Sequence, residues 1–362
     1  MYSDSDLEAA VAAGALTPEA ANALRNYVHG ARATPAVDEE HFRLLTGFND
    51  IFVSIAAVIL LVAVGWIGNS IRIGVEDFAP SPFAGAFVAA TAWGLAEFFT
   101  RKRRMALPSI ILLLAFVMGV FATAGSVMAM IVPPSVLEQH EALAGLMGAG
   151  AAAIAAVAAW LHWRRFKVPI TVAAGAAAMV GVLLGLIAWA VGDTANLKDI
   201  MLGFALVAGI GVFLLAMRWD ASDPTRETRR SDVAFWLHLL AAPLMVHPIF
   251  SLLGLTEGGA TPMEGIIVLL VYILLALTAL AIDRRALLVS ALAYVLWALS
   301  HLFEQAGAVE LNFALTAFVI GSALLLLSAF WHSARRMVVK PLPAGLQARL
   351  PVLDRVAVVA AA

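Results

Sequence analysis

The side chains of this sequence that could do chemistry are histidines and carboxylates inside long apolar stretches. The stretch of residues 231–254, SDVAFWLHLLAAPLMVHPIFSLLG, contains two histidines and two prolines. The two apolar stretches that follow it carry three further ionisable side chains. Ionisable groups are costly inside a membrane and commonly mark functional sites there. Five residues are therefore candidate solute-binding or proton-coupling groups: His238, His247, Glu264, His301 and Glu304.

Several of these candidates fall at one depth. A helix rises about 1.5 Å per residue, which places His247, His301 and Glu304 toward the outer ends of their spans and Glu264 at the outer start of its own. His301 and Glu304 are three residues apart and share a helix face. Two histidines and a carboxylate can bind a divalent metal or transfer a proton near neutral pH. The alternative is that they are polar residues of the membrane interface, and the sequence leaves open whether a metal binds.

Other kinds of chemistry find little support. His238 and His247 are nine residues apart, half a turn out of phase on a helix, so they cannot ligate one haem unless Pro243 kinks the helix. The chain has no cysteine, which excludes disulfides, thiolate metal sites and cysteine nucleophiles. It has no phosphate-binding loop, HExxH motif or GxSxG elbow. We expect no cofactor.

The elements that must position these residues are membrane-spanning helices. Of the 362 residues, 62% are hydrophobic and only 13% are charged, well outside the range of soluble domains. Apolar stretches of about 20 residues recur, each long enough to cross the hydrocarbon core of a bilayer. The sequence therefore predicts an all-α polytopic membrane protein with about ten spans: 48–69, 82–100, 108–131, 140–162, 168–191, 199–218, 232–254, 262–282, 286–304 and 311–332.

The basic residues predict the orientation of these spans. All but Arg72 and Lys198 of the 23 lysines and arginines fall before the first span or after an even-numbered one. Arginine and lysine are enriched in cytoplasmic loops, so we predict that both termini are cytoplasmic. The basic loops are orientation signals in this interpretation, and we expect no nucleic-acid partner.

Polar segments flank the membrane domain. Residues 1–40 predict a cytoplasmic helix pair, with a capping box at Ser5 and Glu8, an N-cap at Thr17 and a break at Gly14. The first 47 residues are polar, so we expect no cleavable signal peptide. Residues 338–362 predict a cytoplasmic tail that is too short and interrupted to span.

The membrane domain shows signs of an internal repeat. A shift of about 181 residues aligns SPFAG (81–85) with TPMEG (261–265), RRMALPS (103–109) with RRALLVS (284–290), and WLHWRR (160–165) with WHSARR (331–336). Both copies start from the same side, which predicts a parallel repeat about an axis along the membrane normal. The predicted parts are a first repeat at 48–166, a two-span insert at 168–218 and a second repeat at 231–337. Ionisable groups have accumulated in the second copy.

Small residues are concentrated in the fourth and fifth spans. Glycines in such spans let helix backbones approach closely. We expect close helix packing at Gly148, Gly175, Gly181 and Gly185.

Two segments carry a family resemblance. AGALTPEAANAL followed by NDIFVSIAAVILLVAVGW, and the later FWLHLLAAPLMVHPIF, resemble sequences of a bacterial family of uncharacterised multi-pass inner-membrane proteins with an N-terminal helix pair. The resemblance implies a location in the bacterial inner membrane. It implies no activity and assigns no functional residues.

Three classes of function fit these patterns. The first is a transporter or permease for a small solute, with proton coupling through the His and Glu groups. The second is a non-transporting scaffold or sensor that binds a protein partner through residues 1–40. The third is a membrane-embedded enzyme that uses His247, His301 and Glu304. The lipid bilayer is a partner in each of them.

Overall fold

The chain forms two compact units. The computed structural model describes residues 7, 10–24, 48–72, 81–132, 136–137, 140, 142–192, 194–224, 226, 228–254, 262–305, 311–347 and 350–353, and only the backbone of some residues of helices α11 to α13. Contacts between residues divide the chain into one unit of residues 1–43 with 354–362 and a second of residues 44–353.

The described part of the first unit is a short helix pair. Residues 10–12 and 18–24 are helical, and Gly14 lies between them with φ of 70°. The hydroxyl of Thr17 accepts a hydrogen bond from the backbone N–H of Ala20 at 3.2 Å, as expected of an N-cap. Ser5 and Glu8, the predicted capping box, lie outside the described residues.

The second unit is built of helices, and the residues described in it contain no β-strand. Each predicted span coincides with a helix. The helices are α3 (Phe48–Ser70), α4 (Pro82–Phe99), α5 (Ala106–Ile131), α7 (Ala142–Phe166), α8 (Ile170–Val191), α9 (Leu197–Ala221), α10 (Arg229–Leu252), α11 (Pro262–Ile282), α12 (Ala286–Gln305), α13 (Asn312–Ala329), α14 (Trp331–Val339) and α15 (Ala344–Gln347).

These helices have the lengths and surfaces of membrane spans. Eight of the described helices are long and apolar enough to cross a bilayer, and α13 with α14 forms a ninth candidate that bends by 76°. Large apolar side chains such as Phe52, Trp66, Phe318 and Leu325 are exposed on the outside of the unit, where lipid covers them. The protein is therefore an all-α polytopic membrane protein. The full number of ten spans stays a prediction.

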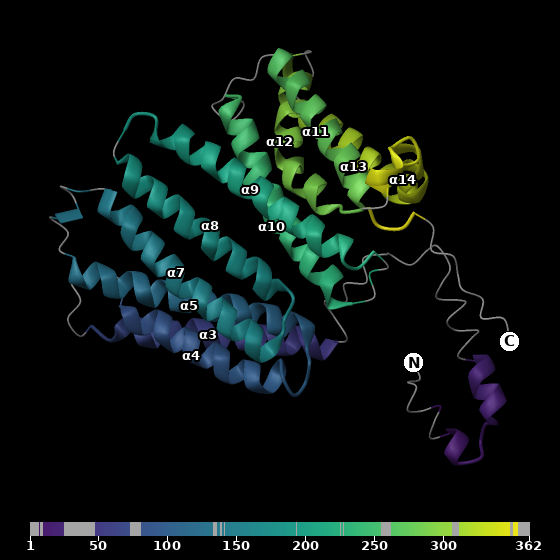
Figure 1. Cartoon of the computed structure of the whole chain (residues 1–362), viewed down its shortest axis with the longest axis horizontal. Helices are drawn as coiled ribbons and strands as arrows, with labels where there is room; N and C mark the ends of the chain where they lie inside the picture. The colour runs from purple at the N-terminus through teal and green to yellow at the C-terminus, as the bar shows by residue number, and fades with distance from the viewer. Residues whose placement is uncertain are drawn as a thin grey trace. The chain divides into compact units, whose positions relative to one another are not determined.

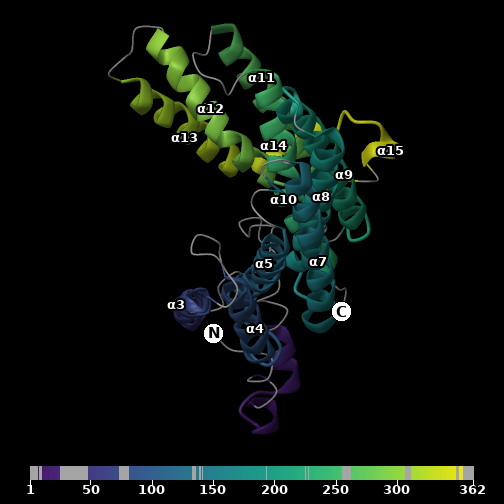
Figure 2. The ribbon, with the colours of Figure 1, turned by 90° about the vertical axis from the view of Figure 1, so that its left-hand side faces the viewer.

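Neighbouring helices pack as antiparallel pairs (Figures 1 and 2). The most extensive contacts join α7 to α8, α9 to α10 and α4 to α5, followed by α3 to α4, α5 to α7 and α11 to α12. Helix α10 also contacts α8 and α12, and half of its most apolar stretch is buried, more than in the other seven candidate spans. Helix α10 therefore links α8 to α12, although Pro243 and Pro248 lie inside it.

Helices α7 and α8 are in close backbone contact, as are α3 with α4 at Gly68 and α4 with α5 at Gly85. A Cβ atom added at Gly145 would lie 2.8 Å from the carbonyl oxygen of Gly185, and one at Gly185 would lie 2.6 Å from that of Gly145. The predicted role of Gly185 agrees with this contact, whereas the prediction for Gly148 is wrong because no heavy atom lies within 4 Å of its added Cβ. The contact lies about one turn earlier on α7, at Gly145.

Four short turns carry the basic residues. The turns α4–α5, α7–α8, α9–α10 and α11–α12 each contain one non-glycine residue with positive φ: Arg104, Lys167, Arg226 and Asp283, at 54° to 57°. The left-handed conformation ends one helix so that the next can turn back. Because consecutive spans are antiparallel, these four turns lie at one end of the bundle, here named the basic end.

The positive-inside pattern gives a testable topology. A reporter enzyme fused after Gly258 should report the outside, because the neighbouring loop is poor in basic residues. A cytoplasmic signal from this fusion would contradict the ten-span topology. Cytoplasmic signals are expected from fusions after Arg104, Arg165, Arg230, Arg285 and Lys340.

The two proposed repeat copies differ at their fourth helices. Helix α7 is continuous from Ala142 to Phe166, whereas α13 ends at Ala329 and α14 turns away by 76°. The similar segments WLHWRR and WHSARR therefore lie on a straight helix in one copy and on a separate short helix in the other. The parallel repeat itself stays a prediction.

A buried charge network at the basic end

A carboxylate, an imidazole and a guanidinium meet inside the second unit. Asp220 lies in the last turn of α9, His238 in α10 and Arg284 between α11 and α12. The Oδ2 atom of Asp220 is 3.0 Å from Nε2 of His238. The same carboxylate accepts hydrogen bonds from Arg284 Nη2 at 2.5 Å and Nε at 3.2 Å. All three side chains are at most 2% exposed, so three separate segments depend on one buried carboxylate.

A second carboxylate, Asp283, continues the network. It accepts hydrogen bonds from Arg226 Nη1 at 2.8 Å and from Trp331 Nε1 at 2.7 Å. The guanidinium of Arg335 lies 3.8 Å from it. Arg226 also donates to the carbonyls of Ile282 and Asp283 at 3.2 and 3.1 Å, which satisfies the carboxyl end of α11. We call the seven residues that these contacts join the charge network: Asp220, Arg226, His238, Asp283, Arg284, Trp331 and Arg335.

The network also holds the segment after α14. Arg335 Nη2 donates to the carbonyl of Pro351 at 2.6 Å, and Nη1 donates to that of Val352 at 3.1 Å. Arg335 is itself 1% exposed. The chain after α14 therefore returns to the bundle and covers this arginine.

Positive charge exceeds negative charge in the network. Three guanidinium groups face two carboxylates, and burial together with the nearby guanidinium of Arg284 lowers the pKa of Arg226 from its ordinary value. Arginine nevertheless stays protonated in proteins. A third carboxylate, Asp223, accepts hydrogen bonds from the backbone N–H and hydroxyl of Thr228 at 2.9 and 2.7 Å.

His238 is the member of the network whose side chain has a second ring nitrogen that can accept a proton. An ionised carboxylate only accepts hydrogen bonds, so Nε2 carries the hydrogen in the contact with Asp220. The other ring nitrogen, Nδ1, is buried without a hydrogen-bond partner among the described residues. In neutral His238 this nitrogen is a free lone pair, which makes it a proton acceptor inside the bundle.

The predicted outer site is only partly described. Nδ1 of His247 lies 2.6 Å from the hydroxyl of Tyr294 on α12, which agrees with the expected packing of the seventh and ninth spans. The side chains of Glu264, His301 and Glu304 lie outside the described residues. Their convergence with His247, and the enzyme hypothesis that depends on it, stay predictions.

The two histidines of α10 have different surroundings. His238 contacts Asp220 and His247 contacts Tyr294, so the described contacts give them no common ligand. In the part of the chain that the structure describes, no three histidine or carboxylate side chains are grouped to hold a metal ion.

Sequence reasoning identified His238 but missed its partners. Arg226, Arg284 and Arg335 were assigned to orientation alone because they lie in or after the loops. Asp220 and Asp283 were not singled out. The available signal was the adjacency of Asp283 and Arg284 at the end of an apolar span, where an acidic residue is not needed for orientation.

An ion pair in the first half of the bundle is exposed, unlike the buried pairs of the charge network. Glu97 and Arg165 form an ion pair at 2.7 and 2.9 Å on the surface. The buried His162 of α7 lies 3.3 Å from the hydroxyl of Thr171 and among aromatic rings, and no carboxylate is among its described contacts. His162 therefore serves as a matched control for His238.

The fold and the charge network define the class: a polytopic helical membrane protein with a buried ionic site at one end. Comparison with protein families, curated proteins and solved structures finds no match to this chain.

Proposed function

We propose that the protein is a proton-coupled transporter of a small solute and that His238 takes up and releases the proton. The observation that carries the proposal is the buried Nδ1 atom of His238, without a described hydrogen-bond partner, on a ring whose Nε2 atom contacts Asp220. Buried ionisable groups of this kind are typical of proton pathways in membrane proteins.

The geometry suggests how a proton can change the helix contacts. Asp220 of α9 is shared between His238 of α10 and Arg284, which belongs to the α11–α12 turn. Protonation of Nδ1 creates an imidazolium that competes with Arg284 for the carboxylate. The α9–α10 pair would then be held less firmly to the α11–α12 pair. A change in this contact is the conformational step that we assign to the proton.

Transport can be measured in liposomes that contain the purified protein. A panel of small solutes is tested for uptake with and without an imposed pH gradient. We expect gradient-driven uptake of at least one solute by the unmodified protein. The His238→Gln variant should fall to the level of protein-free liposomes, because glutamine cannot carry the proton.

The matched control is His162→Gln, which removes a buried histidine that has no described carboxylate partner. It should keep gradient-driven uptake. Equal dependence of uptake on the pH gradient in the unmodified protein and in His238→Gln would overturn the proposal, as would the same loss in both variants.

A second candidate is an interaction role for the N-terminal unit. It is favoured by the division of the chain into two compact units, of which one contains residues 1–43 and the other residues 44–353. Deletion of these residues should then remove binding of a cytoplasmic protein partner and leave the membrane unit folded. Loss of transport without loss of a partner would instead assign the unit to the transporter.

A further inference from the structure

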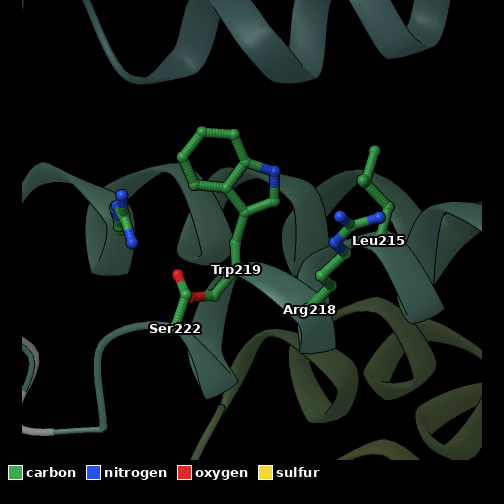
Figure 3. A pocket seen from close by; sticks show the side chains of 5 residues that line it. Leu215, Arg218, Trp219 and Ser222 are labelled. Carbon is green, nitrogen blue, oxygen red and sulfur yellow. The ribbon is translucent and has the colours of Figure 1, made fainter.

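The exposed side of the last turns of α9, at the basic end, forms a pocket that the proposed transport function does not use. The pocket has a volume of about 410 Å³ (Figure 3). Four of its lining residues are spaced along one face of α9 and its C-cap, and the fifth lies in the first turn of α10. They are Leu215, Arg218, Trp219, Ser222 and Arg230.

The pocket is cationic without a competing carboxylate in its lining. Arg218 and Arg230 are both exposed. The acidic residues nearest to Arg218 in sequence, Asp220 and Asp223, are buried and hydrogen-bonded elsewhere, to Arg284 and His238 and to Thr228. Asp232, two residues from Arg230, does not line the pocket. Two exposed arginines therefore line the same pocket. Guanidinium groups match the geometry of phosphate oxygens.

The order of the lining residues matches the layers of a lipid. Leu215 lies one helical turn deeper in the span than Trp219, and Leu215 is exposed on the surface that faces lipid. Tryptophan prefers the boundary between headgroups and hydrocarbon. The hydroxyl of Ser222 donates to the carbonyl of Trp219 at 2.7 Å, which leaves its oxygen able to accept a hydrogen bond from a headgroup hydroxyl.

We propose that this pocket binds the headgroup of an anionic phospholipid. The phosphate lies between Arg218 and Arg230, the indole of Trp219 lies beside the glycerol region, and an acyl chain follows Leu215. Basic pockets at the ends of transmembrane helices suit such headgroups. The inference does not depend on transport, because none of the five lining residues belongs to the charge network.

Lipid binding can be measured on the purified full-length chain by native mass spectrometry. The delipidated protein is titrated with phosphatidylglycerol and, separately, with phosphatidylcholine. We expect phosphatidylglycerol to occupy one site more tightly. In the double variant Arg218→Gln/Arg230→Gln its affinity should fall about 25-fold, since each basic side chain near an anionic headgroup contributes a factor of about five.

The matched control removes two exposed arginines at the same end but outside the pocket. Arg103→Gln/Arg164→Gln loses the same charge and should change the affinity less than about twofold, because these guanidinium groups lie over the rings of Phe98 and Trp160. Equal losses in the two double variants would overturn the site. Equal binding of the two lipids by the unmodified protein would overturn its anionic selectivity.

A further arm separates a lipid from free phosphate. Trp219→Ala should weaken phosphatidylglycerol binding, because the indole contacts the lipid body, and millimolar inorganic phosphate should not displace the lipid. Displacement by inorganic phosphate with no effect of Trp219→Ala would identify a free-anion site and overturn the lipid proposal.

Discussion

Replacing Asp220 by alanine should lower the free energy of unfolding by about 3–5 kcal/mol, the usual cost of removing one partner from a buried ion pair. The carboxylate holds His238 at 3.0 Å and Arg284 at 2.5 Å, and both partners are almost fully buried. Without it the guanidinium of Arg284 loses its ion-pair partner inside the bundle. Unfolding by SDS titration of the detergent-solubilised protein, followed by circular dichroism, measures the change.

Two further variants make this prediction specific. Asp199→Ala removes an exposed carboxylate at the other end of α9 and should change stability by less than about 0.5 kcal/mol. Asp220→Leu combined with Arg284→Met replaces the whole pair with apolar groups and should recover much of the loss. If Asp220→Ala unfolds like Asp199→Ala, the charge network does not stabilise the bundle.

The second large loss of stability is expected from a substitution at the contact between α7 and α8. A valine at Gly145 would place Cβ 2.8 Å from the carbonyl oxygen of Gly185 and 2.9 Å from the backbone nitrogen of Trp189. Backbone atoms cannot rotate away, so the helices must separate. We expect the free energy of unfolding to fall by about 1–3 kcal/mol in the same SDS titration.

Gly148→Val is the natural comparison for this variant. It introduces the same side chain three residues later on the same helix, where the added Cβ has no neighbour within 4 Å. The intrinsic cost of valine in a helix is common to both variants, so their difference measures the contact alone. Equal stabilities would show that the close approach of α7 and α8 contributes nothing.

The helices were predictable because each apolar stretch is long and is interrupted by charged or helix-ending residues. The observed boundaries differ from the predicted ones where charged residues at the ends of an apolar stretch are themselves helical. Helix α10 begins at Arg229 rather than 232, and the hydroxyl of Thr228 accepts the capping hydrogen bond from the N–H of Arg230. The N-cap at Thr17 was predictable because it depends only on neighbours in sequence.

The partners of His238 were not predictable in the same way. Asp220 is 18 residues from His238 in the sequence and 64 residues from Arg284. Predicting these pairs therefore requires knowledge of which helices are adjacent. In a membrane, lipid-facing and packed faces are both apolar, and the sequence pattern carries little information about helix neighbours. The positive-inside rule places arginines on one side and does not say which of them turn inward.

The contacts of Asp283 also set an order of assembly. Arg226 is synthesised before Asp283, whereas Trp331 and Arg335 are synthesised after it. Until they arrive, the indole and guanidinium positions beside Asp283 are empty, and Arg335 then recruits the carbonyls of Pro351 and Val352. A chain that stops before α14 therefore lacks two of the described partners of Asp283, the indole of Trp331 and the guanidinium of Arg335.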